Sequence, residues 1–299
     1  VIAAGDENGN ITFWDIKNKT MVQEWKAHEL RIEHMQSLQN ASIILTHSQN
    51  ELKGWNLWSA EHLWTISIDG LKTFELVQNP DMIITGARNG DIGFWRVLEG
   101  KEMGVIKTDI SLNDFVVLQK RRQIAMISAN LMVNLYDYAG HLVWSKPRIS
   151  HPFETAQSFI AAEKNENCLF ATSGSRNTQV ELISTSSGET INSFNAHSWP
   201  INGVILHPLK STLITYSQDA RIKLWDIVLL QVQDRAIEKG HLDDVTEVCI
   251  LPDGKQGVSC SLDGTALLWD LESGEAIIDF KVPGSFLYSA QVSQDGATL

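Results

Sequence analysis

Short apolar stretches, each ended by a turn signal, recur along the whole chain. The clearest example is a set of four stretches at 244–250, 256–261, 265–270 and 275–280, separated by Pro-Asp-Gly, Asp-Gly and Ser-Gly turns. Stretches of this length predict β-strands rather than helices, and the glycine in each tight turn tolerates a positive φ angle. The pattern therefore predicts four consecutive antiparallel strands.

The third strand of this unit ends in a Trp-Asp pair, and the same arrangement returns at a regular interval. Its aromatic or apolar positions, spaced 40 to 47 residues apart, are Trp14, Trp55, Trp95, Tyr136, Ile183, Trp225 and Trp269. A period of this length is typical of repeat architectures in which radially packed four-stranded sheets form the blades of a β-propeller. The sequence thus predicts an all-β fold, a seven-bladed β-propeller of four-stranded antiparallel blades.

The two ends of the chain supply complementary parts of one repeat. VIAAGDENGNITFWD at the start reads as a second and a third strand, and FLYSAQVSQDGATL at the end reads as a first strand and a turn. We therefore expect the C-terminal strand to complete the first blade, which removes two open sheet edges. We expect residues 1–299 to form a single propeller domain and, because the chain begins with Val1, to be an excerpt of a longer protein.

These features resemble the WD40-repeat (β-transducin-like) family over nearly the whole chain, with Trp225-Asp226 and Trp269-Asp270 as the strongest carriers. The resemblance implies a hydrogen-bonded set within a blade: a His before the first strand, a Ser or Thr on the second, an Asp in the next turn, and the Trp. Two blades match it, with His197, Thr215 or Ser217, Asp219 and Trp225 in one, and His241, Ser259 or Ser261, Asp263 and Trp269 in the other.

Other blades depart from this set. His28 and His151 stand at the His position, but Gln49 and Asn177 replace the Asp of the turn, and Ile183 replaces one Trp. Because buried polar groups need hydrogen-bond partners, we expect the matching residues to have a structural role and not a catalytic one.

The composition argues against several classes of function and structure. The formal net charge of −12 at pH 7 argues against a nucleic-acid binder, which needs a basic face. The three cysteines lack Cys-x-x-Cys spacing, so they predict neither a disulfide framework nor a zinc site, and they favour an intracellular, cytoplasmic setting. No apolar run approaches the roughly 20 residues of a membrane-spanning helix.

No catalytic arrangement stands out, since the chain has no Gly-rich phosphate loop, no His-Glu-x-x-His motif and no Gly-x-Ser-x-Gly elbow. We therefore expect no enzymatic activity, no cofactor and no metal, and interpret the chain as a non-catalytic scaffold within a larger complex. Two alternatives stay open. The propeller could be a regulatory or sensor domain of a larger enzyme or signalling protein, or it could bind a phosphoinositide through Arg121 and Arg122.

The resemblance implies that a protein or peptide partner docks on the face that carries the loops between blades, around the central channel. The candidate partner-binding residues on that face are Arg31, Arg88, Arg176, Trp199, Asp243, Asp244, Phe286 and Tyr288. Aromatic and Arg side chains are the usual energetic anchors of interfaces, so Trp199 is the first choice. Long connections at 147–156 and 228–235 are further places where specificity is expected.

Overall fold

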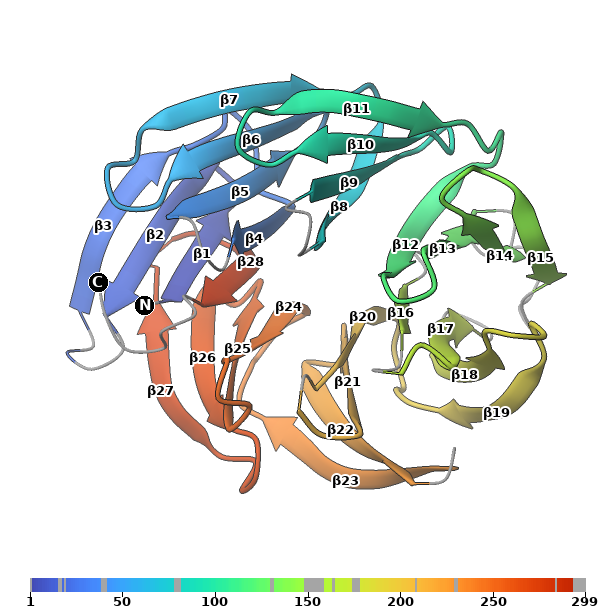
Figure 1. Ribbon diagram of the computed structural model, residues 1–299. Helices are drawn as coiled ribbons and strands as arrows, with labels where there is room; N and C mark the ends of the chain where they lie inside the picture. Colours follow the sequence, from blue (N-terminus) through green and yellow to red (C-terminus); the bar gives the residue numbers. More distant parts are fainter. Residues whose placement is uncertain are drawn as a thin grey trace.

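The protein, in a computed structural model, is a ring of seven four-stranded antiparallel sheets, which confirms the predicted seven-bladed β-propeller (Figure 1). The structure describes residues 2–15, 18, 20–38, 42–77, 82–129, 132–147, 159–162, 165–173, 178–207, 209–228, 231–282 and 284–292. One strand of each sheet lies against the central channel and one lies at the perimeter of the ring.

Each blade has four strands, ordered from the inner strand beside the channel to the outer one. Blade 1 contains β28 (Leu287–Val292), β1 (Ile2–Asp6), β2 (Asn10–Asp15) and β3 (Thr20–Lys26). Blade 2 contains β4 (His34–Leu38), β5 (Ile43–Ser48), β6 (Glu51–Asn56) and β7 (His62–Ser67). Blade 3 contains β8 (Leu71–Val77), β9 (Met82–Ala87), β10 (Ile92–Arg96) and β11 (Lys101–Ile106). Blade 4 contains β12 (Leu112–Leu118), β13 (Gln123–Ser128), β14 (Met132–Asp137) and β15 (Leu142–Pro147). Blade 5 contains β16 (Ile160–Ala162), β17 (Cys168–Ser173), β18 (Gln179–Ser184) and β19 (Thr190–Asn195). Blade 6 contains β20 (Ile201–Leu206), β21 (Thr212–Ser217), β22 (Arg221–Val228) and β23 (Gln231–Lys239). Blade 7 contains β24 (Val245–Ile250), β25 (Gln256–Ser261), β26 (Thr265–Asp270) and β27 (Ala276–Lys281).

The burial of each strand follows its position in the blade. The second strands β5 and β21 are buried at every residue, because the neighbouring blades cover both faces of the sheet. The outer strand β19 instead alternates between exposed and half-buried residues, as expected when successive side chains point to opposite faces. The continuous apolar runs of the sequence are therefore the middle strands, and the alternating runs are the outer ones.

The hydrophobic core consists of seven clusters, one at each junction between neighbouring blades. The cluster between blades 6 and 7, for example, contains Tyr216 and Leu224 of blade 6 together with Val248 and Trp269 of blade 7. Each blade thus buries both faces only because it has two neighbours, so the stability of any blade depends on the completed ring.

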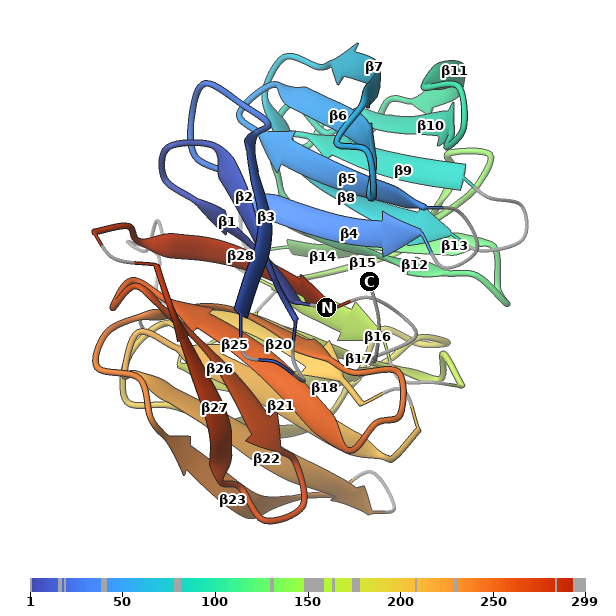
Figure 2. The ribbon, with the colours of Figure 1, turned by 90° about the vertical axis from the view of Figure 1, so that its left-hand side faces the viewer.

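Blade 1 closes the ring, and it does so as predicted from the two ends of the sequence. The inner strand β28 pairs antiparallel with β1, so that Ala290 lies opposite Ala4 (Figures 1 and 2). The backbone N–H of Phe286 also donates to Glu7 Oε2 at 2.6 Å, across 279 residues of sequence. This pairing covers the edge of β1 that faces the channel, so β1 has a paired strand on both sides.

One expectation about loops was wrong. Residues 228–235 do not form a long connection, because β22 and β23 continue as a paired hairpin in which Val228 lies opposite Gln231. The β-branched Ile227 and Val228 extend the strand past the Trp-Asp pair, as such residues favour strands. The other expected long connection, 147–156, lies outside the described residues except for Pro147. No helix in the described part of the chain is long and apolar enough to cross a membrane.

Candidate functional site

A hydrogen-bond set in blade 7 joins the loop before β24 to the middle of the sheet. His241 Nδ1 lies 3.1 Å from Asp263 Oδ2, and His241 Nε2 lies 2.6 Å from Ser259 Oγ. The indole Nε1–H of Trp269 donates to the same hydroxyl at 2.6 Å. Of the two serines left open by the sequence, Ser259 takes this position, while Ser261 donates to a loop carbonyl.

Blade 6 contains the same arrangement with a threonine. His197 Nδ1 lies 3.0 Å from both carboxylate oxygens of Asp219, and His197 Nε2 lies 2.8 Å from Thr215 Oγ1. Trp225 Nε1–H donates to Thr215 Oγ1 at 3.0 Å. Because the carboxylate accepts the Nδ1–H, the neutral ring leaves Nε2 as the acceptor of the threonine hydroxyl. Burial opposes the charge on Asp219, but the hydrogen bond and charge of His197, the backbone N–H of Ser198 and the charge of Lys223 together outweigh it, so the pKa of Asp219 is lowered.

The same two aspartates hold the loops that carry exposed apolar side chains. Asp263 Oδ2 accepts the backbone N–H of Leu242 at 2.8 Å, and Asp219 Oδ2 accepts that of Ser198 at 3.3 Å. Leu242 is 91% exposed, and Trp199, which follows Ser198, is 60% exposed. A loop that is fixed before binding loses less entropy on docking, so the two sets preorganise these side chains.

Blade 2 has an incomplete set, as its sequence predicts. His28 Nε2 lies 2.8 Å from Thr46 Oγ1, which also accepts Trp55 Nε1–H at 2.9 Å. The turn residue is Gln49, so His28 Nδ1 has no hydrogen-bond partner in the described structure and lies 3.5 Å from Glu51 Oε2. Burial, with the nearby positive charge of a lysine, lowers the pKa of His28 to about 4. The other predicted incomplete set, with His151 and Asn177, lies outside the described residues.

A central channel of about 1330 Å³ opens between the loops that join one blade to the next and the turns that join the second strand of a blade to the third. We call this side of the ring the loop face. Four candidate partner-binding residues line the channel, namely Arg31, Arg88, Asp244 and Tyr288. Trp199, Phe286 and Asp243 are exposed on the loop face outside the channel lining. Arg176 lies outside the described residues.

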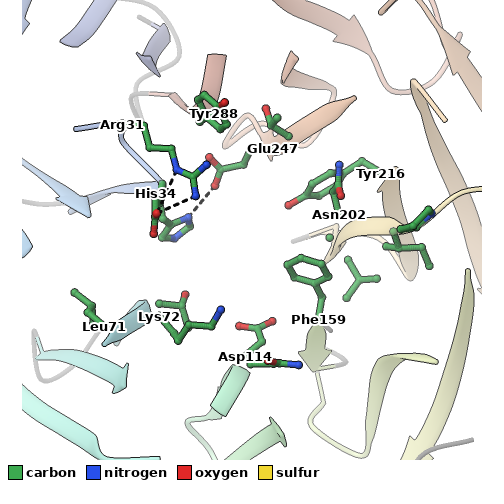
Figure 3. A pocket seen from close by; sticks show the side chains of 18 of the residues that line it. Arg31, His34, Leu71, Lys72, Asp114, Phe159, Asn202, Tyr216, Glu247 and Tyr288 are labelled. Atoms are coloured by element: carbon green, nitrogen blue, oxygen red, sulfur yellow. Dashed lines mark hydrogen bonds and ion pairs between the residues drawn. The ribbon is translucent and has the colours of Figure 1, made fainter. Parts of the chain in front are cut away.

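Two of these lining residues already contact each other. The guanidinium of Arg31 lies over the ring of Tyr288, 5.3 Å from its centroid, and Arg31 Nη2 lies 3.2 Å from Glu33 Oε1 (Figure 3). The charge of Arg31 is therefore satisfied within the chain, and its contact joins blade 2 to blade 1 across the channel rim.

The inner strands carry polar side chains that sequence reasoning did not single out. His34 Nδ1 of blade 2 lies 3.0 Å from Glu247 Oε1 of blade 7 (Figure 3). The other oxygen of Glu247 accepts the hydroxyl of Ser289 and, at 2.9 Å, the backbone N–H of Ala290. Burial opposes the charge on His34, but the Glu247 carboxylate outweighs it and raises the pKa of His34. Blades 7, 1 and 2 are thus linked through one carboxylate.

Similar contacts join blades 2 to 5, where a side-chain oxygen on one inner strand accepts a backbone N–H of the next blade. The acceptor and donor pairs are Gln36 with Leu76 at 2.9 Å, Glu75 with Val117 at 2.8 Å, and Asp114 with Ile160 at 3.0 Å. Burial raises the pKa of Glu75 to about 8 and that of Asp114 to about 7. An acidic residue inside an otherwise apolar inner strand is the sequence signal that could have located these contacts.

A serine, a carboxylate and a histidine are linked beside the channel, but their order differs from that of a serine paired with a histidine. The hydroxyl of Ser289 donates to the Glu247 carboxylate and not to His34, so the histidine is not placed to take its proton. Ser289 is also fully buried. Within the described residues, no group of three or more His, Cys, Asp and Glu side chains could hold a metal ion.

The basic turn between β12 and β13 lies on the side of the ring opposite the loop face, and its groups have partners within the chain. Arg121 Nη2–H donates to Asn167 Oδ1 at 3.2 Å, and the guanidinium of Arg122 lies 5.8 Å from the ring centroid of Tyr138. The backbone N–H of Arg121 donates to the carboxylate of Glu166 at 3.0 Å. The arrangement holds the turn in place and puts an acidic group beside it.

Comparison with known proteins shows which blades match a known repeat family. The family model WD40, described as "WD domain, G-beta repeat", matches residues 188–226 and 233–270. These stretches contain the first three strands of blades 6 and 7, the two blades with complete hydrogen-bond sets. Blades 6 and 7 thus match WD40 repeats, which confirms the resemblance seen in the sequence. The other five blades repeat the same four-strand layout with fewer of the family's polar residues.

Three relatives of this chain show how far the similarity extends. Periodic tryptophan protein 2 of Arabidopsis thaliana is 20% identical over 269 residues, which is 89% of this chain and 25% of that protein. Pre-mRNA-processing factor 19 of Caenorhabditis elegans is 30% identical over 111 residues, 36% of this chain and 22% of that protein. A subunit of chromatin assembly factor 1 from Gallus gallus is 28% identical over 108 residues, 30% of this chain and 19% of that protein. The matches thus span a quarter or less of each relative's own length.

Proposed function

We propose that this WD40 propeller is a non-catalytic protein-interaction scaffold that binds a protein or peptide segment on the loop face, around the mouth of the channel. The observation that carries the proposal is an arc of exposed apolar side chains on the interblade loops. The arc consists of Trp199, Leu242, Phe286 and Leu30, which are 60%, 91%, 53% and 49% exposed and precede the inner strands of blades 6, 7, 1 and 2 in turn. Exposed apolar side chains that gather around a cavity mark an interaction site.

The rigidity of the supporting loops favours the same proposal. Asp219 and Asp263 fix the backbone beside Trp199 and Leu242, so these side chains are presented without a large ordering cost on binding. Among the relatives, one is named as part of a chromatin assembly factor, which supports a protein partner within a larger complex. We place this complex in the cytoplasm, where thiols such as those of Cys249 and Cys260 stay reduced.

The test uses a random peptide library displayed on phage, selected on the immobilised chain, followed by affinity measurements on the enriched peptides. Trp199→Ala and Leu242→Asp should each weaken binding by about tenfold or more, because truncating a central apolar anchor removes much of the binding energy. Trp58→Ala is the matched control, since Trp58 is 45% exposed in the turn after β6, on the opposite side of the ring.

Near-ultraviolet circular dichroism verifies that each variant keeps its fold. If the enriched peptides bind Trp199→Ala and Leu242→Asp as tightly as the wild type, the loop face is not the binding surface. If no peptide is enriched on the wild type, the proposed function is wrong.

A further inference from the structure

Two cations stand side by side at the channel mouth on blade 3. Lys72 is the second residue of β8, and Arg88 follows the end of β9. The two strands pair with Leu71 opposite Ala87, and the backbone N–H of Arg88 donates to Gly70 O at 2.7 Å. Both side chains line the channel. A chain with a formal net charge of −12 therefore places two positive groups together where a partner would enter.

Neither cation forms an ion pair among the described residues, although the carboxylates of Glu33 and Asp114 act on Lys72 from a longer distance. In the described part of the chain, no carboxylate oxygen lies within 4.0 Å of Lys72 Nζ or of the Arg88 guanidinium, and neither side chain donates a hydrogen bond, whereas Arg31 is paired with Glu33. Burial, followed by the charge of Arg88, lowers the pKa of Lys72. Two neighbouring cations without an anion repel each other, and a bound anion removes that repulsion.

The nearest acidic groups are already in use. The Glu33 carboxylate accepts hydrogen bonds from Arg31 and lies 3.8 Å from His47 Nε2. Both oxygens of Asp114 accept backbone N–H groups, at 2.9 and 3.0 Å. The two carboxylates whose charges act on Lys72 are thus engaged elsewhere and form no ion pair with it, so a carboxylate supplied by a partner can pair with Lys72 and Arg88.

The opposite wall of the channel carries two aromatic side chains. Phe159 and Tyr216 project into the space that faces Lys72 and Asp114 (Figure 3). Tyr216 can lie there because Gly203 is opposite it in the strand pair, and any Cβ at 203 would overlap the Tyr216 hydroxyl and ring. The channel mouth therefore has a cationic side on blade 3 and an aromatic side on blades 5 and 6.

Resting on the proposed function, we propose that the channel mouth recognises a protein segment with a carboxylate side chain, which lies between Lys72 and Arg88 while a neighbouring apolar side chain contacts Phe159 and Tyr216. A carboxylate suits the site better than a phosphate. The carboxylates of Asp69, Asp114 and Glu33 border the same channel and repel a phosphate dianion more strongly than a carboxylate with a single negative charge.

The test selects the same displayed peptide library on three forms of the chain. These are the wild type, the neutral double variant Lys72→Gln/Arg88→Gln and the charge-reversed variant Lys72→Glu/Arg88→Glu. The matched control is Lys210→Glu/Lys255→Glu, which makes the same change in net charge at two exposed turn residues on the opposite side of the ring. The neutral variant keeps the test decisive if charge reversal prevents folding.

We expect one position of the peptides enriched by the wild type to be Asp or Glu. The neutral variant should lose this preference, charge reversal should replace it with Lys or Arg, and the control should keep it. Peptides selected by the wild type should bind the neutral variant about tenfold or more weakly. Enriched peptides without an acidic position, or with equal affinity for all four forms, overturn this inference and leave the proposed function standing. Tighter binding of a synthetic peptide with phosphoserine at that position overturns the carboxylate in favour of a phosphate. No enrichment on the wild type refutes the proposed function, and this inference with it.

Discussion

Removing one buried hydroxyl should reveal how strongly the polar set of blade 6 stabilises the propeller. Thr215 Oγ1 accepts Trp225 Nε1–H at 3.0 Å and donates to His197 Nε2 at 2.8 Å, and the threonine side chain is fully buried. Thr215→Val keeps the shape and the strand preference of the residue but deletes the hydroxyl. The substitution therefore leaves two buried polar groups, one donor and one acceptor, without partners.

The chain contains its own reference for this substitution. Thr85 of blade 3 also accepts an indole N–H, from Trp95 at 2.8 Å, but no histidine lies on its other side. Each buried polar group that loses its partner costs about 1–3 kcal/mol, so Thr215→Val should cost about 2–6 kcal/mol and Thr85→Val about 1–3 kcal/mol. The informative quantity is the difference between the two variants, about 1 kcal/mol or more, because the loss of the hydroxyl itself cancels.

Urea denaturation followed by tryptophan fluorescence measures both variants, since the chain has ten tryptophans as probes. Repeat folds can unfold in more than one step, so hydrogen exchange of blade 6 should accompany the global midpoint. We expect the amides of β21 and β22 to lose more protection in Thr215→Val than those of β9 and β10 lose in Thr85→Val. Equal losses would refute the ordered set of Trp, Thr and His and would mean that the histidine adds nothing to the stability.

Three further substitutions or deletions test other parts of the ring. Glu75→Gln gives blade 3 the uncharged acceptor that Gln36 supplies in blade 2. The pKa of the wild-type Glu75 is raised from 4.5 to about 8 in the fold, so the contribution of Glu75 to the free energy of unfolding is fully present at low pH and is lost as the pH rises through about 8. The variant should therefore be more stable than the wild type by roughly 1–3 kcal/mol near pH 9 and no more stable near pH 4, and a constant difference in urea midpoints would contradict this. Gly203→Ala should cost about 1–3 kcal/mol in thermal or urea unfolding, and adding Tyr216→Leu should recover part of the loss, whereas simple additivity would exclude the overlap. Deleting 285–299 removes β28 and should cause aggregation relative to the full chain on size-exclusion chromatography with light scattering, and an unchanged oligomeric state would show that closure is dispensable.

The ring of seven blades could be predicted from the sequence because the turns and the repeat are visible in short stretches of the chain. The spacing of Trp14, Trp55 and the later positions fixed the number of blades, and the complementary ends predicted the closure. The expected long connection at 228–235 was wrong, since nothing local distinguishes residues that extend a hairpin from residues of a loop. Whether Ile227 and Val228 find partners depends on the strand that returns beside them.

The channel was harder to anticipate because its contacts join residues far apart in the chain. Glu247 contacts His34 only after seven blades have formed a ring, and no spacing in the sequence relates the two. Whether Lys72 and Arg88 form ion pairs likewise depends on the contacts that the carboxylates of other blades make in the folded ring. Trp199 could be found from the sequence because its position follows directly from the repeat.

Because β28 pairs with β1, blade 1 cannot be completed until the ribosome has synthesised β28. Glu7 and Phe286 are 279 residues apart, so at about 5–20 residues per second a ribosome needs on the order of 15 to 60 s to make the segment between them. Throughout that interval β1 has β2 on one side and no partner on the other. Of the seven blades, the one that contains β1 is thus begun before the others and completed after them, and the edge of β1 stays unpaired until β28 has been made.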